Sequence, residues 1–128
     1  MSKQIPAVPS APAAMGPYSA VVEANGFVFF SGQVALDPQT SERLTALDVG
    51  GQTHQVMNNI VAILGDLDLT TDAIVKTTIF LKDINDYAAV NEVYGTYMGE
   101  TPPARSAVEV ANLPGGFLVE IELIALRP

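Results

Sequence analysis

The sequence contains no cysteine and a single histidine, His54. Without cysteine the chain can form neither a disulfide framework nor a thiolate zinc site, and it has no thiol nucleophile. One imidazole cannot build a multi-histidine metal site, and on a predicted helix we interpret His54 as a solvated or hydrogen-bonded side chain. The residues therefore predict no metal site.

Long apolar runs are also missing. No segment approaches the roughly 18 uninterrupted apolar residues that a membrane-spanning helix needs. The first 19 residues contain four prolines and a glycine, and they lack an apolar core of signal-peptide length. We therefore expect no membrane span and a cytoplasmic protein.

Positive charge is scarce, because 14 acidic residues face only 6 basic ones and the net charge is −8. Such a field repels phosphate backbones, so general nucleic-acid binding is disfavoured. A single arginine can still hold a small anion, because charges are screened over about 8 Å. The hydrophobic fraction of 48% with only 16% charged residues is high for a small soluble domain. Self-association would explain this excess.

At 128 residues the chain is long enough for one domain, 1–128. Prolines at 6, 9, 12 and 17 predict an extended arm over residues 1–17. Beyond it, hydrophobic periodicity predicts strands and helices in the order β-β-α-β-α-β-β. These are strands 19–24 and 27–33 around the hairpin signal Asn25-Gly26, helix 49–67, strand 75–81, helix 87–98, and strands 104–110 and 117–126.

This order predicts an α/β (α+β) fold, a mixed sheet with two helices packed on one face. The connection between the last two strands is left open by its length. It is short enough for a hairpin, and it is also long enough to step over one neighbouring strand.

Two residues near the end of the chain carry candidate chemistry. Arg105 lies on a predicted strand, and its permanently charged planar guanidinium suits either a structural ion pair or an anion-binding site. Glu120 lies on the last predicted strand, after a Pro-Gly-Gly loop. In a tight hairpin the two would not lie opposite each other, so a shared site would then need a second subunit.

Several blocks of the sequence together resemble the Rid family, also called YjgF, of reactive-intermediate deaminases. The blocks follow one another in order from Ala11 to the end of the chain without a large gap. They are APAAMGPYSAVV, FFSGQVALDP, IVKTTIFLKDINDYAAVNEVY, PPARSAVEVANLP and VEIELIAL.

The resemblance implies a fold like that of bacillus chorismate mutase, in which the last strand lies antiparallel between two others. It implies a homotrimer with a site in each cleft between subunits. The implied activity is hydrolysis of 2-imino acids, or of their enamine tautomers, to 2-keto acids and ammonia. This hydrolysis needs no cofactor and no metal.

The resemblance also assigns site residues. Arg105 would bind the substrate carboxylate through two hydrogen bonds and orient the imino carbon for attack. Glu120 would orient or activate the attacking water and transfer protons to the departing nitrogen, although by itself it could be a half-exposed strand carboxylate. Tyr18 would wall the pocket and hydrogen-bond the substrate, or it could simply anchor the arm.

Four further residues complete the implied site. Ser31 and Gly32 would line the pocket, with glycine permitting close approach. Asn91 matches a recurrent pocket asparagine, although on a helix it could equally be solvated. Ala107 stands where many family members have cysteine. It removes thiol chemistry and should spare hydrolysis if this position acts through its main-chain carbonyl.

Two alternatives to a deaminase follow from the same residues. The first is a non-catalytic trimer that binds a 2-keto acid or a similar small anion, as a sensor or chaperone-like module. The second is an endoribonuclease or translation inhibitor, a role also attached to this family. The net charge of −8 and the lack of basic clusters count against the second alternative.

Overall fold

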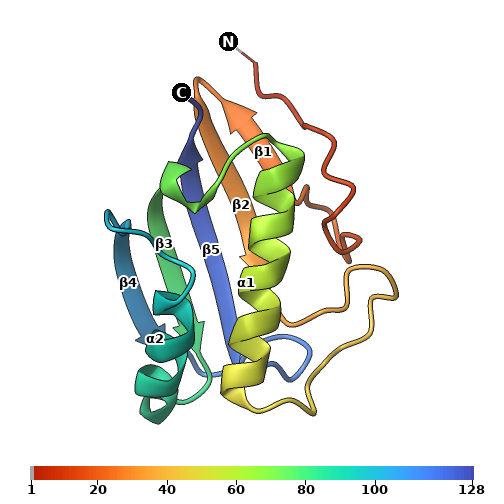
Figure 1. Cartoon of the computed structure of the whole chain (residues 1–128). Coiled ribbons are helices and arrows are strands. Elements are labelled where there is room, and N and C mark those ends of the chain that lie inside the picture. The colour runs from red at the N-terminus through yellow and green to blue at the C-terminus, as the bar shows by residue number, and fades with distance from the viewer. Residues whose placement is uncertain (1) are drawn as a thin grey trace.

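Five strands form one mixed sheet, and both α-helices pack on the same face of it (Figure 1). The side chains alternate between the two faces along each strand and recur every 3.6 residues along each helix, so each element has one face to bury. The computed structural model describes residues 2–128, so the first residue of the predicted arm 1–17 lies outside it. The predicted order and fold class are confirmed. The elements are β1 (Val21–Ala24), β2 (Phe27–Gln33), α1 (Val49–Asp66), β3 (Ile74–Leu81), α2 (Tyr87–Gly95), β4 (Ala104–Glu109) and β5 (Val119–Leu126), with short 3₁₀ turns at Thr71–Ala73 and Ile84–Asp86.

The chain begins its sheet with the hairpin β1–β2. Asn25 and Gly26 both take positive φ, 55° and 83°, which is the backbone geometry that lets a two-residue loop match the twist of the strands. The first strand starts at Val21 and not at residue 19. Ahead of it, Ser31 holds the backbone in a different way: its hydroxyl donates to the Ser19 carbonyl and its amide donates to the Ala20 carbonyl.

The strand order is β1-β2-β5-β3-β4, and it rules out a hairpin between the last two strands. β5 lies between β2 and β3 and is antiparallel to both. β4 pairs parallel with β3 on the other side, through the crossover helix α2. The loop after β4 therefore steps over β3, as the resemblance implied, and β5 becomes the central strand.

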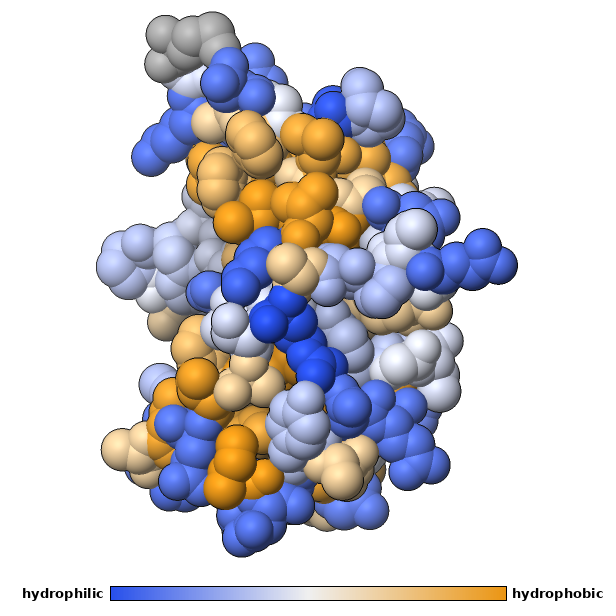
Figure 2. All heavy atoms as spheres, turned by 90° about the vertical axis from the view of Figure 1, so that its left-hand side faces the viewer, coloured by the Kyte–Doolittle hydropathy of each residue, from blue (hydrophilic) through white to orange (hydrophobic). Residues whose placement is uncertain are grey.

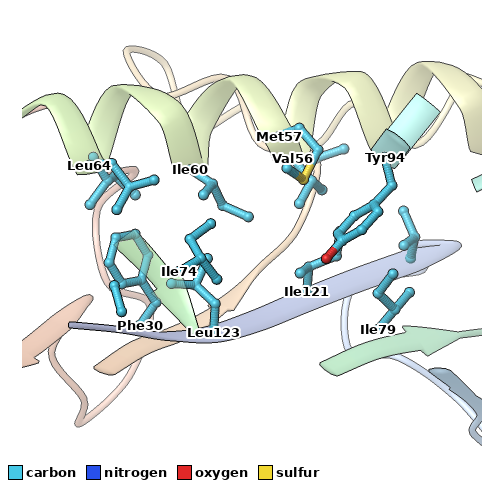
Figure 3. Packing of buried hydrophobic residues seen from close by; sticks show 14 of the residues in the cluster. Phe30, Val56, Met57, Ile60, Leu64, Ile74, Ile79, Tyr94, Ile121 and Leu123 are labelled. Atoms are coloured by element: carbon cyan, nitrogen blue, oxygen red, sulfur yellow. The ribbon is translucent and has the colours of Figure 1, made fainter. Parts of the chain in front are cut away.

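The core lies between the sheet and α1 (Figure 3). Met57, Ile60 and Leu64 on one face of α1 point at the sheet, where Leu123 and Ile121 of β5 meet them. Spacings of three and four residues put these α1 side chains on one stripe, and burying each one contributes about 1.5–3 kcal/mol. Asp48 caps the start of α1, because its carboxylate accepts a hydrogen bond from the Gly51 amide at 2.8 Å.

Two fully or almost fully buried polar side chains of α1 hold the loops at one end of the sheet. Gln52 accepts a hydrogen bond from the Leu118 amide at 2.9 Å, just before β5. Asn59 donates to the Leu36 carbonyl at 2.9 Å, just after β2. Because an unpaired buried amide is costly, these bonds fix both loops to the helix.

Two further ends that differ from the prediction by two or more residues have local causes, while the end of α1, the start of β3 and the end of β4 differ by a single residue. α2 ends at Gly95 and not at residue 98, because the next amides make i→i−3 turns and the Thr96 hydroxyl donates to the Val93 carbonyl at 2.6 Å. β5 starts at Val119 and not at residue 117, because Gly115 and Gly116 take positive φ in the preceding turn.

The arm is fastened at two points. Gln4 makes two backbone hydrogen bonds of 2.8 Å with Glu23 of β1, and the Ser10 amide and hydroxyl both donate to the Asp66 carboxylate at the end of α1. Figure 1 shows the arm running beside β1. In the described part of the chain, neither helix has the length and apolar character to cross a membrane.

Candidate functional site

Arg105 lies on β4 and reaches toward α2. Its guanidinium donates to the Asn91 side-chain oxygen at 2.5 Å and to the Tyr87 hydroxyl at 2.6 Å. The guanidinium carbon also lies 5.5 Å from the ring centre of Tyr87 and 5.1 Å from that of Tyr94, at cation–π distance. Tyr94 is itself fixed, because it is buried and shares a 2.8 Å hydrogen bond with Thr77 of β3.

All of these partners of Arg105 are neutral. Within residues 2–128, the single ion pair joins Arg127 to Glu23, and no carboxylate lies within ion-pair distance of Arg105. A structural ion pair inside the chain is therefore not the role of this arginine. Its charge is held in place by hydrogen bonds and aromatic faces and is left without a counter-charge, which is what an anion-binding group needs.

A cavity of about 550 Å³ opens beside this guanidinium. Asn91 and Tyr94 of α2 form one wall, and Pro102 and Pro103 before β4 form another. The Arg105 guanidinium, the Asn91 amide and the Tyr94 ring thus converge on a mostly apolar recess. Such a combination is usual in small-molecule sites.

Glu120 lies on β5 against Gly32 of β2. A Cβ atom at Gly32 would lie 2.7 Å from the Glu120 carboxyl carbon, so only glycine leaves room for the carboxylate. Burial raises the pKa of Glu120, and the charge of nearby Glu122 raises the pKa further. A carboxyl group whose pKa is raised toward neutral pH is suited to giving and taking protons.

A second cavity, of about 600 Å³, surrounds Glu120. Tyr18 and Ser31 line it together with Gly32, so four of the predicted site residues meet there. Tyr18 is half exposed, and its hydroxyl accepts a hydrogen bond from the Met15 amide at 3.2 Å. The Ser31 hydroxyl donates to the Ser19 carbonyl at 2.6 Å and thereby holds the residue next to Tyr18.

Arg105 and Glu120 lie on opposite faces of the sheet. Thr77 of β3 is paired with both Arg105 and Leu123, and paired residues on neighbouring strands share a face. Glu120 is three positions from Leu123, and side chains alternate along a strand, so Glu120 points the other way. Within one chain the predicted residues therefore form two groups, Arg105 with Asn91 and Glu120 with Tyr18, Ser31 and Gly32.

Ala107 belongs to the face of Arg105, two residues further along β4 and opposite Ile79. It is partly buried against the core and lines neither of the two cavities. Throughout residues 2–128, no group of three or more His, Cys, Asp or Glu side chains is placed to hold a metal ion.

Sequence reasoning missed Tyr87 and Tyr94, the two tyrosines that support Arg105. With Asn91 they are spaced by four and three residues, which puts all three on one face of α2. A stripe of two phenols and an amide on a short helix, facing a strand with one arginine, was the available signal. The cavity residues Arg43 and Phe117 were also missed, and no local pattern marks them.

Comparison with known proteins places the chain in a family. The family model described as Endoribonuclease L-PSP matches residues 8–127. The chain belongs to this family, and its resemblance to the Rid proteins is confirmed.

Relatives in this family carry more than one name. A RutC family protein of Synechocystis is 49% identical, with 100% of this chain and 99% of the relative covered. A 2-iminobutanoate/2-iminopropanoate deaminase of Salmonella typhimurium is 47% identical, with 99% of each chain covered. The crystal structure of Escherichia coli TdcF with bound serine matches with a TM-score of 0.89 at 41% identity, covering 98% of this chain and 99% of that one.

Proposed function

We propose that this protein is a hydrolase that converts 2-imino acids, and their enamine tautomers, into 2-keto acids and ammonia. The observation that carries the proposal is the Arg105 guanidinium, which is held by neutral hydrogen-bond acceptors and two tyrosine rings without a carboxylate partner in the described chain. The family membership and the deaminase name of a relative 47% identical support the same activity.

In this proposal Arg105 binds the carboxylate at carbon 1 of the substrate, which orients the adjoining C=N carbon. Glu120 accepts a proton from water as the water oxygen bonds to that carbon. The same carboxyl group gives this proton to the nitrogen, which yields a carbinolamine. Glu120 then takes the proton of the carbinolamine hydroxyl and passes it to the nitrogen as the C–N bond breaks and the C=O bond forms, so that ammonia and the keto acid leave. The raised pKa of Glu120 brings its two protonation states closer to balance at working pH, which both steps require.

Because Arg105 and Glu120 lie on opposite sheet faces, we propose that two copies of the chain complete each site and that the assembly is a homotrimer. The helix-free face of the sheet supports self-association. Phe27, Phe29 and Leu126 are each more than 40% exposed, and their pairing puts them on the same face as Glu120. Figure 2 views the molecule from the β4 side and shows apolar areas separated by a band of hydrophilic atoms.

The alternative of a non-catalytic binding module has one supporting observation, the serine bound to the E. coli relative. Both readings use the same arginine, and the two differ only in whether bound imine is hydrolysed faster. The endoribonuclease name of the family is a weaker guide for this chain, because its net charge of −8 opposes RNA.

The proposal is tested by measuring how fast an imine that is generated in the assay is hydrolysed. An amino-acid oxidase acting on 2-aminobutanoate releases 2-iminobutanoate, and 2-ketobutanoate formation is followed with and without the purified protein. We expect the protein to accelerate keto-acid release, Arg105→Ala to abolish the acceleration, and Arg105→Lys to restore only part of it because lysine lacks the planar fork. Saturable keto-acid binding without acceleration would support the binding module instead, and full activity in Arg105→Ala would contradict the proposed role of the arginine.

A further inference from the structure

Among residues 2–128, Arg43 is the only basic side chain that lines the Glu120 cavity. It follows a loop that is ordered by its own hydrogen bonds. The Asp37 carboxylate accepts from the Gln39 and Thr40 amides at 2.9 and 3.0 Å, and the Ser41 amide donates to the Asp37 carbonyl at 2.9 Å. Arg43 then pairs with Leu36 in a short antiparallel bridge, so the loop presents its side chain from a fixed backbone.

The guanidinium of Arg43 has no bonding partner among residues 2–128. Within residues 2–128, the other two arginines are held by side chains, Arg105 by Tyr87 and Asn91 and Arg127 by Glu23. Arg43 makes no side-chain hydrogen bond and no ion pair in the same part of the molecule. An unpaired cation at the wall of a cavity can take an anionic group from a ligand.

The Arg43 side chain lies next to the turn at Gly115 and to Phe117, which also line the cavity. Gly115 has a φ of 90°, and a Cβ atom there would lie 3.1 Å from a ring carbon of Phe117 and 3.7 Å from the Arg43 guanidinium carbon. Glycine therefore leaves room for the Phe117 ring, and the Arg43 guanidinium lies beside the same turn. The result is a cavity region with an apolar ring and a cation.

Arg43 and Glu120 line the same cavity. The pKa of Glu120 is raised by burial and by the charge of Glu122. The cavity that the two side chains share is large, since 600 Å³ equals the volume of about 20 water molecules. A substrate of four carbons leaves much of that space unused.

We propose that Arg43 is a specificity-determining residue that binds a second carboxylate, so that the substrates of this protein include 2-imino acids with an acidic side chain. This inference rests on the proposed deaminase function. In the completed site, Arg105 of one copy binds the carboxylate at carbon 1, Glu120 of another copy lies at the C=N carbon, and Arg43 binds the carboxylate at the far end. The order along the ligand is acid group, reacting carbon, acid group.

The kinetic test compares two imines. An amino-acid oxidase supplies 2-iminobutanoate from 2-aminobutanoate, and a glutamate oxidase supplies 2-iminoglutarate from glutamate. The quantity measured is the ratio of kcat/KM for the dicarboxylic imine to kcat/KM for the monocarboxylic imine. We expect Arg43→Gln to lower this ratio about 10- to 100-fold, and Arg43→Lys to lower it less, because a charged hydrogen bond to a carboxylate is lost or weakened.

The matched control is Lys3→Gln. It removes the same charge from an exposed residue of the arm that lines neither cavity, and we expect it to leave the ratio unchanged. A ratio that Arg43→Gln does not change would overturn the inference, whether the two rates both fall or both stay. So would an equal fall of the ratio in Lys3→Gln, because the effect would then be general charge repulsion.

A binding measurement separates this inference from the proposed function. Calorimetric titration with 2-ketoglutarate and with 2-ketobutanoate needs no catalysis. We expect 2-ketoglutarate to bind more tightly, and Arg43→Gln to remove that preference. If neither imine is hydrolysed faster but the preference depends on Arg43, the deaminase proposal fails and the acid-binding role of Arg43 stands. If the imines are hydrolysed faster and the preference is absent or independent of Arg43, the role of Arg43 fails alone.

Discussion

The two cavities hold their charged groups in opposite ways. Around Arg105 the chain supplies partners, two hydrogen-bond acceptors and two aromatic rings from α2 and its start. Around Glu120 it supplies space, because Gly32 has no side chain and no described donor bonds the carboxylate. In the proposed mechanism Arg105 must stay charged, and contacts with its ion hold it; Glu120 must change its protonation, and it is left half buried with its charge poorly stabilised.

The largest effect should come from removing the titrating group. We expect Glu120→Gln to reduce kcat/KM for 2-iminobutanoate by about 10²- to 10⁴-fold, because the amide cannot accept and return a proton. Binding of 2-ketobutanoate, measured by calorimetry, should change far less, since Arg105 remains. A Glu120→Gln protein that retains wild-type kcat would show that the carboxylate takes no part in proton transfer.

The next effect tests whether space is what the Glu120 side requires. In Gly32→Ala the new methyl group would lie 2.7 Å from the Glu120 carboxyl carbon, so the carboxylate must move. We expect kcat/KM to fall about 10- to 100-fold, because small misplacements of a catalytic group are costly. The control is Gly65→Ala in α1, where a methyl group meets nothing within 4 Å; it should leave activity unchanged and stabilise the helix by about 0.5–1 kcal/mol.

A smaller effect should follow from loosening the Arg105 side. Tyr87→Phe and Asn91→Ala each remove one hydrogen bond to the guanidinium. Each should raise KM about five-fold while kcat changes less, because a partly exposed bond of this kind contributes about 1 kcal/mol. Asn58→Ala, which removes a similar amide from Tyr97 just after α2, is the control, and an equal rise in KM there would mean that the effect is not specific to Arg105.

The smallest effect concerns stability. The same substitution, Glu120→Gln, that lowers activity should make the folded protein more stable at neutral pH. The pKa of Glu120 is raised in the folded protein, so the folded state binds more protons than the unfolded state between the two pKa values. Ionised Glu120 therefore lowers stability at neutral pH, and the loss disappears as the pH falls through the raised pKa. We expect Glu120→Gln to raise Tm by a few degrees at pH 7 and to differ little from wild type near pH 4, as measured by thermal unfolding.

Most elements could be predicted because their signals are local. Asn25-Gly26 fixes a two-residue hairpin, and the β-branched run 75–81 favours a strand. The position of β5 could not be predicted from residues 112–116, because a loop of that length fits two topologies. Only the resemblance favoured the correct one, since strand order is set by how the whole sheet buries its apolar face.

In the site, too, the residues with a local signal could be predicted and their arrangement in space could not. Arg105 and Glu120 were recognisable from residue type and resemblance, but their separation onto two faces depends on the pairing of β3 with both β4 and β5. No local pattern encodes that pairing. Tyr87 and Tyr94 were visible in the sequence as helix residues, yet their contact with Arg105 required knowing that α2 crosses beside β4.

The most direct test of the proposed shared site is to mix two inactive variants. Arg105→Ala and Glu120→Ala each lose one half of every site, and mixed assemblies formed by unfolding and refolding them together would again contain some sites with both halves intact. If each site takes its halves from neighbouring copies drawn at random from an equal mixture, about a quarter of wild-type activity should return. An inactive mixture whose subunits have demonstrably exchanged would contradict a site shared between copies.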